Sequence, residues 1–166
     1  MPNPPPYQTF NPRDPKLTRE QLDYYTRMSM LGLYGFSQKL PELPGWVAER
    51  MNAHTALYKG LVRRFVREAD LYRLTAQPRR SGDGERWCAF QYSLPDRSEH
   101  LLFVFRLPGA EAQRSIRLVD FDPARSYTIE GFDGESPLTI LGSDLMERGL
   151  LFSTIKEEGS ALLRIV

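Results

Sequence analysis

The sequence predicts an α+β protein that is mainly β, with two N-terminal helices followed by a small antiparallel β-sandwich of seven to eight strands. Two observations lead to this fold class. In residues 18–69, apolar side chains recur every three or four residues, which is the spacing of an amphipathic helix. From residue 71 the spacing changes to two, and turn sequences separate the short apolar segments. We therefore divide the chain into an extended proline-rich arm (1–17), a helical segment (18–69) and a β-sandwich domain (70–166).

The helical segment contains clear start and stop signals. Thr18 and Gln21 have the spacing of a capping box, so the first helix is predicted to begin there, and Gly32 and Gly35 are expected to end it. The turn sequence LPELPG at 40–45 then precedes one long amphipathic helix. The apolar stripe of this second helix consists of Val47, Met51, His54, Tyr58, Leu61, Phe65 and Ala69.

The β-sandwich is predicted from alternating apolar residues. In 87–94, Cys88, Phe90 and Tyr92 are expected to face the core, and the residues between them are expected to face solvent. The segment LLFVF at 101–105 is apolar on both faces, which is typical of a central strand. Further strands are expected at 71–75, 116–118, 127–130, 137–141, 150–155 and 160–165.

Composition excludes several classes of function. Lys and Arg number 22 and Asp and Glu 21, a net charge of +1, so we expect neither a nucleic-acid partner nor an anionic membrane partner. No run of about 18 apolar residues occurs, and no basic start followed by an apolar run marks an export signal. The single cysteine fits a reducing compartment, and two histidines are too few for a typical zinc site. We expect a cytoplasmic protein without metal or cofactor.

Individual residues offer weak candidates for chemistry. Asp120 and Asp122 in DFDP could act as paired carboxylates, although Asp-Pro is ordinary turn chemistry. His54 could be an acid or base, but its helical spacing favours a packed, hydrogen-bonded side chain. Cys88 is expected to be a small, buried, apolar side chain. The two glycines of SGDGER at 81–86 favour a hairpin turn over a phosphate-binding loop.

The order of three longer segments carries a family resemblance. The segments are GLYGFSQKLPELPGWVAERMNAHTALYKGLVRRFVREADLYRLTAQP, WCAFQYSLPDRSEHLLFVFR and GSDLMERGLLF. Together they resemble the C-terminal end of the α-galactosidase-like enzymes of glycoside hydrolase family 36, the melibiase group. The resemblance implies that residues 18–69 are the last helices of a (β/α)8 barrel and that the sandwich is the C-terminal domain. It also implies that the two catalytic aspartates of these retaining enzymes lie on barrel strands, outside this sequence.

Two functions therefore stay open. The first is a fragment of such an enzyme, a non-catalytic C-terminal module that caps and stabilises the catalytic barrel of the same or a companion chain and is itself inactive on α-galactosides. The second is an autonomous β-sandwich that binds carbohydrate, with Trp87 and Gln91 forming an exposed platform for a sugar or an interface. Because the apolar face of the helices would lack a barrel beneath it, we also expect the isolated chain to self-associate.

Overall fold

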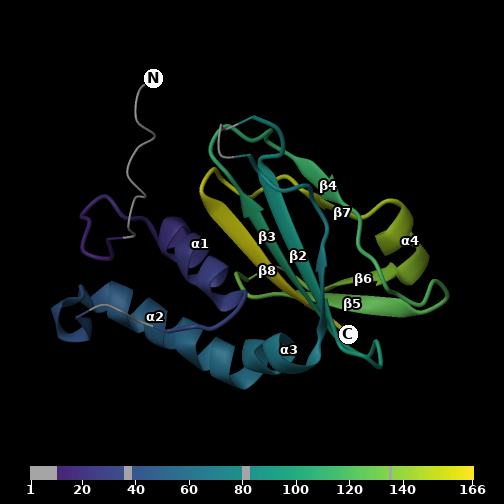
Figure 1. Ribbon diagram of the computed structural model, residues 1–166, viewed down its shortest axis with the longest axis horizontal. Helices are drawn as coiled ribbons and strands as arrows, with labels where there is room; N and C mark the ends of the chain where they lie inside the picture. The colour runs from purple at the N-terminus through teal and green to yellow at the C-terminus, as the bar shows by residue number, and fades with distance from the viewer. Residues whose placement is uncertain (1–10, 36–38, 80–82, 135) are drawn as a thin grey trace.

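The computed structural model describes residues 11–35, 39–79, 83–134 and 136–166, which form three layers (Figure 1). Helices form the first layer, a six-stranded sheet the second, and a two-stranded sheet with a short helix the third. The helices are α1 (Arg19–Met30), η1 (Leu40–Glu42), α2 (Gly45–Leu57), η2 (Tyr58–Val62), α3 (Arg63–Glu68) and α4 (Gly142–Glu147). The strands are β1 (Asp70–Arg73), β2 (Trp87–Ser93), β3 (His100–Arg106), β4 (Arg114–Ile116), β5 (Ser126–Gly131), β6 (Leu138–Leu141), β7 (Leu150–Phe152) and β8 (Gly159–Ile165).

The helical predictions are confirmed. The Thr18 hydroxyl accepts a hydrogen bond from the Gln21 backbone at 3.2 Å, and the Gln21 side chain accepts one from the Thr18 backbone at 3.1 Å. This capping box satisfies two backbone donors at the start of α1. The second helix is continuous from Gly45 to Glu68, with η2 as a π-helical turn between α2 and α3. No helix in the described ranges is long and apolar enough to cross a membrane.

The sheets confirm the predicted fold class. The larger sheet has the strand order β1-β2-β3-β8-β5-β6 with antiparallel pairing throughout, and β4 pairs with β7 in the smaller one. The strand predicted to be central, 101–105, lies within β3, between β2 and β8. Six of the seven residues of β3 are buried, as a strand covered on both faces requires.

The predicted orientation of β2 is wrong. Trp87, Ala89 and Gln91 were expected to face solvent, but their exposed fractions are 2%, 0% and 0%. They face a core formed with the third layer, whereas Cys88 and Phe90 on the opposite face pack against the core shared with the helices. Both faces of β2 are covered, so the alternation of apolar and less apolar residues in its sequence does not indicate a solvent-exposed face.

Most of the apolar face of the helices is covered by the large sheet of the same chain, which the sequence did not indicate, and the expected self-association stays a prediction. Tyr58 and Phe65 are buried in one core with Phe103, Phe105 and other residues of the large sheet. In that core the helices cover the face of the sheet turned away from the third layer (Figure 1). Among the described residues of the helical segment, Leu33 after α1 has a fully exposed side chain. The boundary near residue 70 coincides with the step from α3 to β1, but whether the parts fold separately stays a prediction.

Candidate functional site

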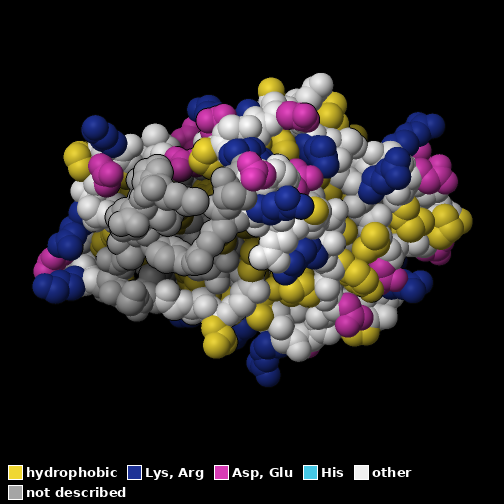
Figure 2. Space-filling model, turned by 45° about the horizontal axis from the view of Figure 1, so that its top comes forward, with side chains coloured by type: hydrophobic (Ala, Val, Ile, Leu, Met, Phe, Trp, Pro, Cys, Tyr) yellow, Lys and Arg dark blue, Asp and Glu magenta, His cyan; other side chains and the backbone are white. Residues whose placement is uncertain are grey.

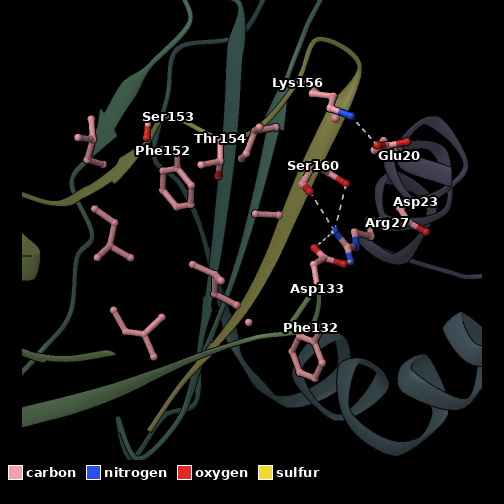
Figure 3. A pocket seen from close by; sticks show the side chains of 18 of the residues that line it. Glu20, Asp23, Arg27, Phe132, Asp133, Phe152, Ser153, Thr154, Lys156 and Ser160 are labelled. Atoms are coloured by element: carbon pink, nitrogen blue, oxygen red, sulfur yellow. Dashed lines mark hydrogen bonds and ion pairs between the residues drawn. The ribbon is translucent and has the colours of Figure 1, made fainter. Parts of the chain in front are cut away.

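A cleft of about 690 Å³ lies between α1 on one side and strands β5, β7 and β8 on the other (Figure 3). Its volume is within the range typical of ligand pockets. One wall carries charged side chains from α1 and α2, together with Asp133 after β5. The opposite wall and the floor are mainly apolar and come from β5, β7, β8 and the connection between β7 and β8, with Ile129, Leu150, Phe152, Ile155, Ala161 and Leu163.

Arg27 is the central charged residue of this cleft, and it is only 1% exposed. Strand β5 pairs with β8 only as far as Leu163, so it leaves β8 unpaired on that side near Ser160. There the Arg27 guanidinium donates a hydrogen bond to the Ser160 carbonyl at 3.0 Å. It also forms a two-point ion pair with Asp133, at 2.8 and 2.5 Å. Arg27 therefore joins α1 to the sheet at the position where β5 ends.

A second set of contacts joins α1 to α2. The Arg50 guanidinium donates to both carboxylate oxygens of Asp23, at 2.7 and 2.6 Å, and His54 Nε2 lies 2.6 Å from Asp23 Oδ1. Arg50 also lies 3.6 Å from Asp133, so the two sets of contacts are connected. We call these five residues, Asp23, Arg27, Arg50, His54 and Asp133, the charge clamp.

The electrostatics of the charge clamp favour a structural role. Burial by itself raises the pKa of the Asp23 carboxyl, but hydrogen bonds from His54 and Arg50 outweigh it and hold the pKa well below its usual range. Asp23 is therefore ionised at neutral pH and cannot donate a proton as a general acid. Asp133 is likewise engaged by Arg27 through both carboxylate oxygens. The arrangement can hold two helices against a sheet.

The charge clamp was missed by the sequence interpretation, although a signal for part of it exists. Asp23 and Arg27 are four residues apart on α1, and Arg50 and His54 are four residues apart on α2. Charged residues at this spacing share one helix face, and here that face is the buried one. Two such pairs on neighbouring helices predict a buried polar contact between the helices. Asp133 follows β5 and has no comparable local signal.

The paired-carboxylate interpretation of Asp120 and Asp122 finds no support in their contacts. The Asp120 carboxylate pairs with Arg97 at 2.7 Å and accepts a hydrogen bond from the Tyr72 hydroxyl at 3.3 Å. Asp122 instead accepts a hydrogen bond from the Ala124 backbone at 2.9 Å, which is ordinary turn chemistry. The two side chains therefore serve different local contacts.

The remaining candidate residues also have structural roles, in a hydrogen bond, in core packing or in a turn. His54 is buried and bonded to Asp23, as its helical spacing favours. Cys88 is half-buried, and burial raises the pKa of its thiol, which disfavours the reactive thiolate. In SGDGER, residues 81 and 82 lie outside the described residues, and Gly84 adopts a positive φ of 84°. The described residues contain no cluster of three His, Cys, Asp or Glu side chains that could hold a metal ion.

Trp87 and Gln91, the predicted platform, both lie in the interior. The Gln91 amide donates to the Val119 carbonyl at 2.6 Å and to the Ser93 hydroxyl at 2.8 Å. The same hydroxyl lies 2.8 Å from Nδ1 of His100, which is fully buried. These contacts link β2 to β3 through buried polar groups. Trp87 itself is only 2% exposed, so its ring offers no surface on which a sugar could stack.

Comparisons with known proteins find similarity only among solved structures. No protein-family model matches the chain, and no curated protein matches it. The α-galactosidase AgaA of glycoside hydrolase family 36 from Geobacillus stearothermophilus is 26% identical, with a TM-score of 0.70 over 84% of this chain. The family 36 α-galactosidase AgaB from the same organism is also 26% identical over 84% of this chain, with a TM-score of 0.68.

An α-galactosidase from Lactobacillus brevis shares the fold over 85% of this chain, with 18% identity and a TM-score of 0.68. The chain spans only about a fifth of each of these three solved chains, 18% of AgaA, 18% of AgaB and 19% of the L. brevis enzyme. Its resemblance to family 36 α-galactosidases is therefore confirmed, over a span consistent with their C-terminal region.

Proposed function

We propose that this chain is the non-catalytic C-terminal module of an α-galactosidase-like glycoside hydrolase acting on α-galactosides, and that it caps and stabilises the catalytic barrel. The main support for this proposal is the structural match to the α-galactosidase AgaA. It extends over 84% of this chain at 26% identity but over only 18% of AgaA. At 166 residues the chain is shorter than the roughly 250 residues of a typical (β/α)8 barrel, so we infer that the catalytic barrel is formed by residues outside it.

The charge clamp supports a stabilising role. By resemblance, α1 and the α2–α3 segment are the last helices of the barrel. Arg27 and Asp133 fix α1 to the large sheet, and Asp23 with Arg50 fixes α2 to α1. A barrel that contained these helices would be held to the sandwich at the same points.

The surface around the connection between α1 and α2 supports a barrel partner. Leu33 is fully exposed, Leu40 is 51% exposed, and Met28, near the end of α1, is 41% exposed. An exposed apolar patch on a protein surface is typical of a site that another part of the protein or a partner covers. We infer that the barrel covers this surface, in the same chain or in a companion chain. The cytoplasm is the proposed location, since the single cysteine fits a reducing compartment.

The proposal is tested by replacing the matching segment of AgaA. AgaA without that segment should be inactive on an aryl α-galactoside, and fusing residues 11–166 of this chain at the same point should restore soluble, active enzyme. AgaA with its own segment rejoined through the same fusion site is the control. Inactive fusion protein beside an active control would contradict the capping role.

The non-catalytic part of the proposal has its own assay. The isolated chain should show only background hydrolysis of an aryl α-galactoside, because a retaining mechanism needs two positioned carboxylates, one of them protonated. Turnover by the isolated chain that disappears in Asp120→Asn or Asp122→Asn would contradict this part.

A further inference from the structure

Strand β6 is an uncharged edge of the large sheet. It pairs with β5 on one side and is the last strand in the sheet order. Its four residues are Leu, Thr, Ile and Leu, and Leu138 and Leu141 are 52% and 44% exposed. The opposite edge, β1, carries charges at both ends, Asp70 and Arg73, which is a common device against strand pairing. Strand β6 carries no charge, although it is short and follows Pro137.

The hydrogen bonds of the neighbouring residues show which backbone groups of β6 point outward. Gly142 N–H donates to the Arg125 carbonyl at 2.8 Å, in the same register that pairs Ile140 with Tyr127. Because backbone groups alternate along an antiparallel strand, Leu138 and Ile140 also bond toward β5. The N–H and C=O groups of Thr139 and Leu141 therefore point away from the sheet.

We propose that β6 binds β6 of a second copy of this chain, as an antiparallel pair about a two-fold axis. In the register centred on Ile140, Thr139 of one copy exchanges two hydrogen bonds with Leu141 of the other, and the symmetric pair does the same. All outward backbone groups of both strands are then used. The two large sheets become one continuous sheet across the axis.

Side-chain chemistry supports a second copy as the occupant. In this register Ile140 lies opposite its own symmetry mate, and Thr139 lies opposite Leu141, so no like charges meet across the axis. Isologous contacts require such self-complementarity. The net charge of +1 adds no appreciable long-range repulsion between copies.

The apolar surface extends beyond the strand. Leu138 lines the cleft together with Leu151 of β7, which is 65% exposed. Figure 2 shows hydrophobic side chains gathered at the right-hand end of the molecule, where α4, β5 and β6 lie in Figure 1. Burying this surface would add to the four strand hydrogen bonds. Because the strand is short and the paired area small, we expect a weak dimer that forms only at high protein concentration.

Sedimentation of the isolated chain over a range of concentrations tests the inference. We expect a reversible monomer–dimer equilibrium, with hydrogen exchange at the Thr139 and Leu141 amides slowed as the concentration rises. Thr139→Pro removes one outward donor without removing a bond to β5, and Leu141→Lys places like charges near the axis. Each variant should weaken the dimer at least ~10-fold.

Leu71→Lys is the matched control, because Leu71 is 53% exposed on the opposite edge strand. It should leave the dimer unchanged. A chain that stays monomeric at all concentrations would overturn the inference, as would a dimer that persists in Leu141→Lys or one that is lost only in Leu71→Lys. Circular dichroism shows whether Thr139→Pro remains folded, and if it does not, Leu141→Lys alone decides. These measurements need no activity, so their failure is distinct from failure of the proposed function.

Discussion

Arg27→Met tests whether the charge clamp stabilises the fold. Methionine keeps most of the length of the arginine stem but removes the guanidinium. Asp133 then loses a two-point ion pair, and the Ser160 carbonyl loses the donor at 3.0 Å. Because Arg27 is 1% exposed, water cannot replace these hydrogen bonds without opening the contact between α1 and the sheet.

The expected cost follows from the groups left behind. Removing one partner of a buried ion pair typically costs about 3–5 kcal/mol, because the other charge stays in the interior. The Asp133 side chain is 28% exposed and keeps Arg50 at 3.6 Å, so part of its charge remains compensated. We therefore expect Arg27→Met to lower the free energy of unfolding by about 3 kcal/mol, the lower end of this range.

Urea unfolding at 25 °C, followed by circular dichroism, measures this change. Lys156→Met is the control on the same helix–sheet contact, because Lys156 pairs with Glu20 at 2.8 Å but its side chain is 75% exposed. We expect its unfolding midpoint to match that of the unmodified chain within error. A loss below about 1 kcal/mol for Arg27→Met would show that the clamp contributes no more than an ordinary surface pair.

Three further predictions concern a buried histidine, a tightly packed glycine and the helical layer. Burial lowers the pKa of His100 from 6.5 to about 4. Between these two pH values the unfolded chain binds more protons than the folded chain does, so the stability present above pH 6.5 is lost as the pH falls toward 4. His100→Asn should flatten this part of the pH dependence of urea unfolding. Gly149→Ala should lower the free energy of unfolding by roughly 2 kcal/mol or more in the same assay, because the φ of Gly149 is +74° and an added Cβ would lie 2.2 Å from the Ile116 carbonyl oxygen. Gly60→Ala is the control. An added Cβ there meets open space, so this variant should lose no stability. A chain beginning at Asp70 should bind hydrophobic dye and aggregate, since the helices cover one face of the large sheet, and a well-behaved monomer would contradict that coverage.

Features encoded by neighbouring residues were predictable. The capping box at Thr18 needs residues only three positions apart, and the long helix shows its period over several turns. The central position of β3 follows from an unbroken apolar run, which only a strand covered on both faces can bury. The fold class was predictable for the same reasons.

Features that depend on distant segments were not predictable. The outward orientation assigned to Trp87 failed because β4, β7 and α4, which cover that face, lie farther along the chain. The ion pair between Arg27 and Asp133 spans 106 positions, and no local pattern connects them. The packing of Tyr58 and Phe65 against the large sheet was not predictable either, because helical periodicity shows that a face is apolar but not what covers it.

The position of β3 between two cores has a consequence for sequence variation. Leu102 and Val104 face one core, and Leu101, Phe103 and Phe105 face the other, all with 0% exposure. A strand at a sheet surface tolerates polar exchanges at every second position, whereas β3 offers no such position from Leu101 to Phe105. Its side chains also fix the thickness of both adjoining layers, so enlarging one side chain pushes the helices or the small sheet outward. We expect a deep mutational scan to show a continuous intolerant stretch at 101–105, whereas β5, whose buried residues alternate with less buried ones at its start, should show alternating tolerance there.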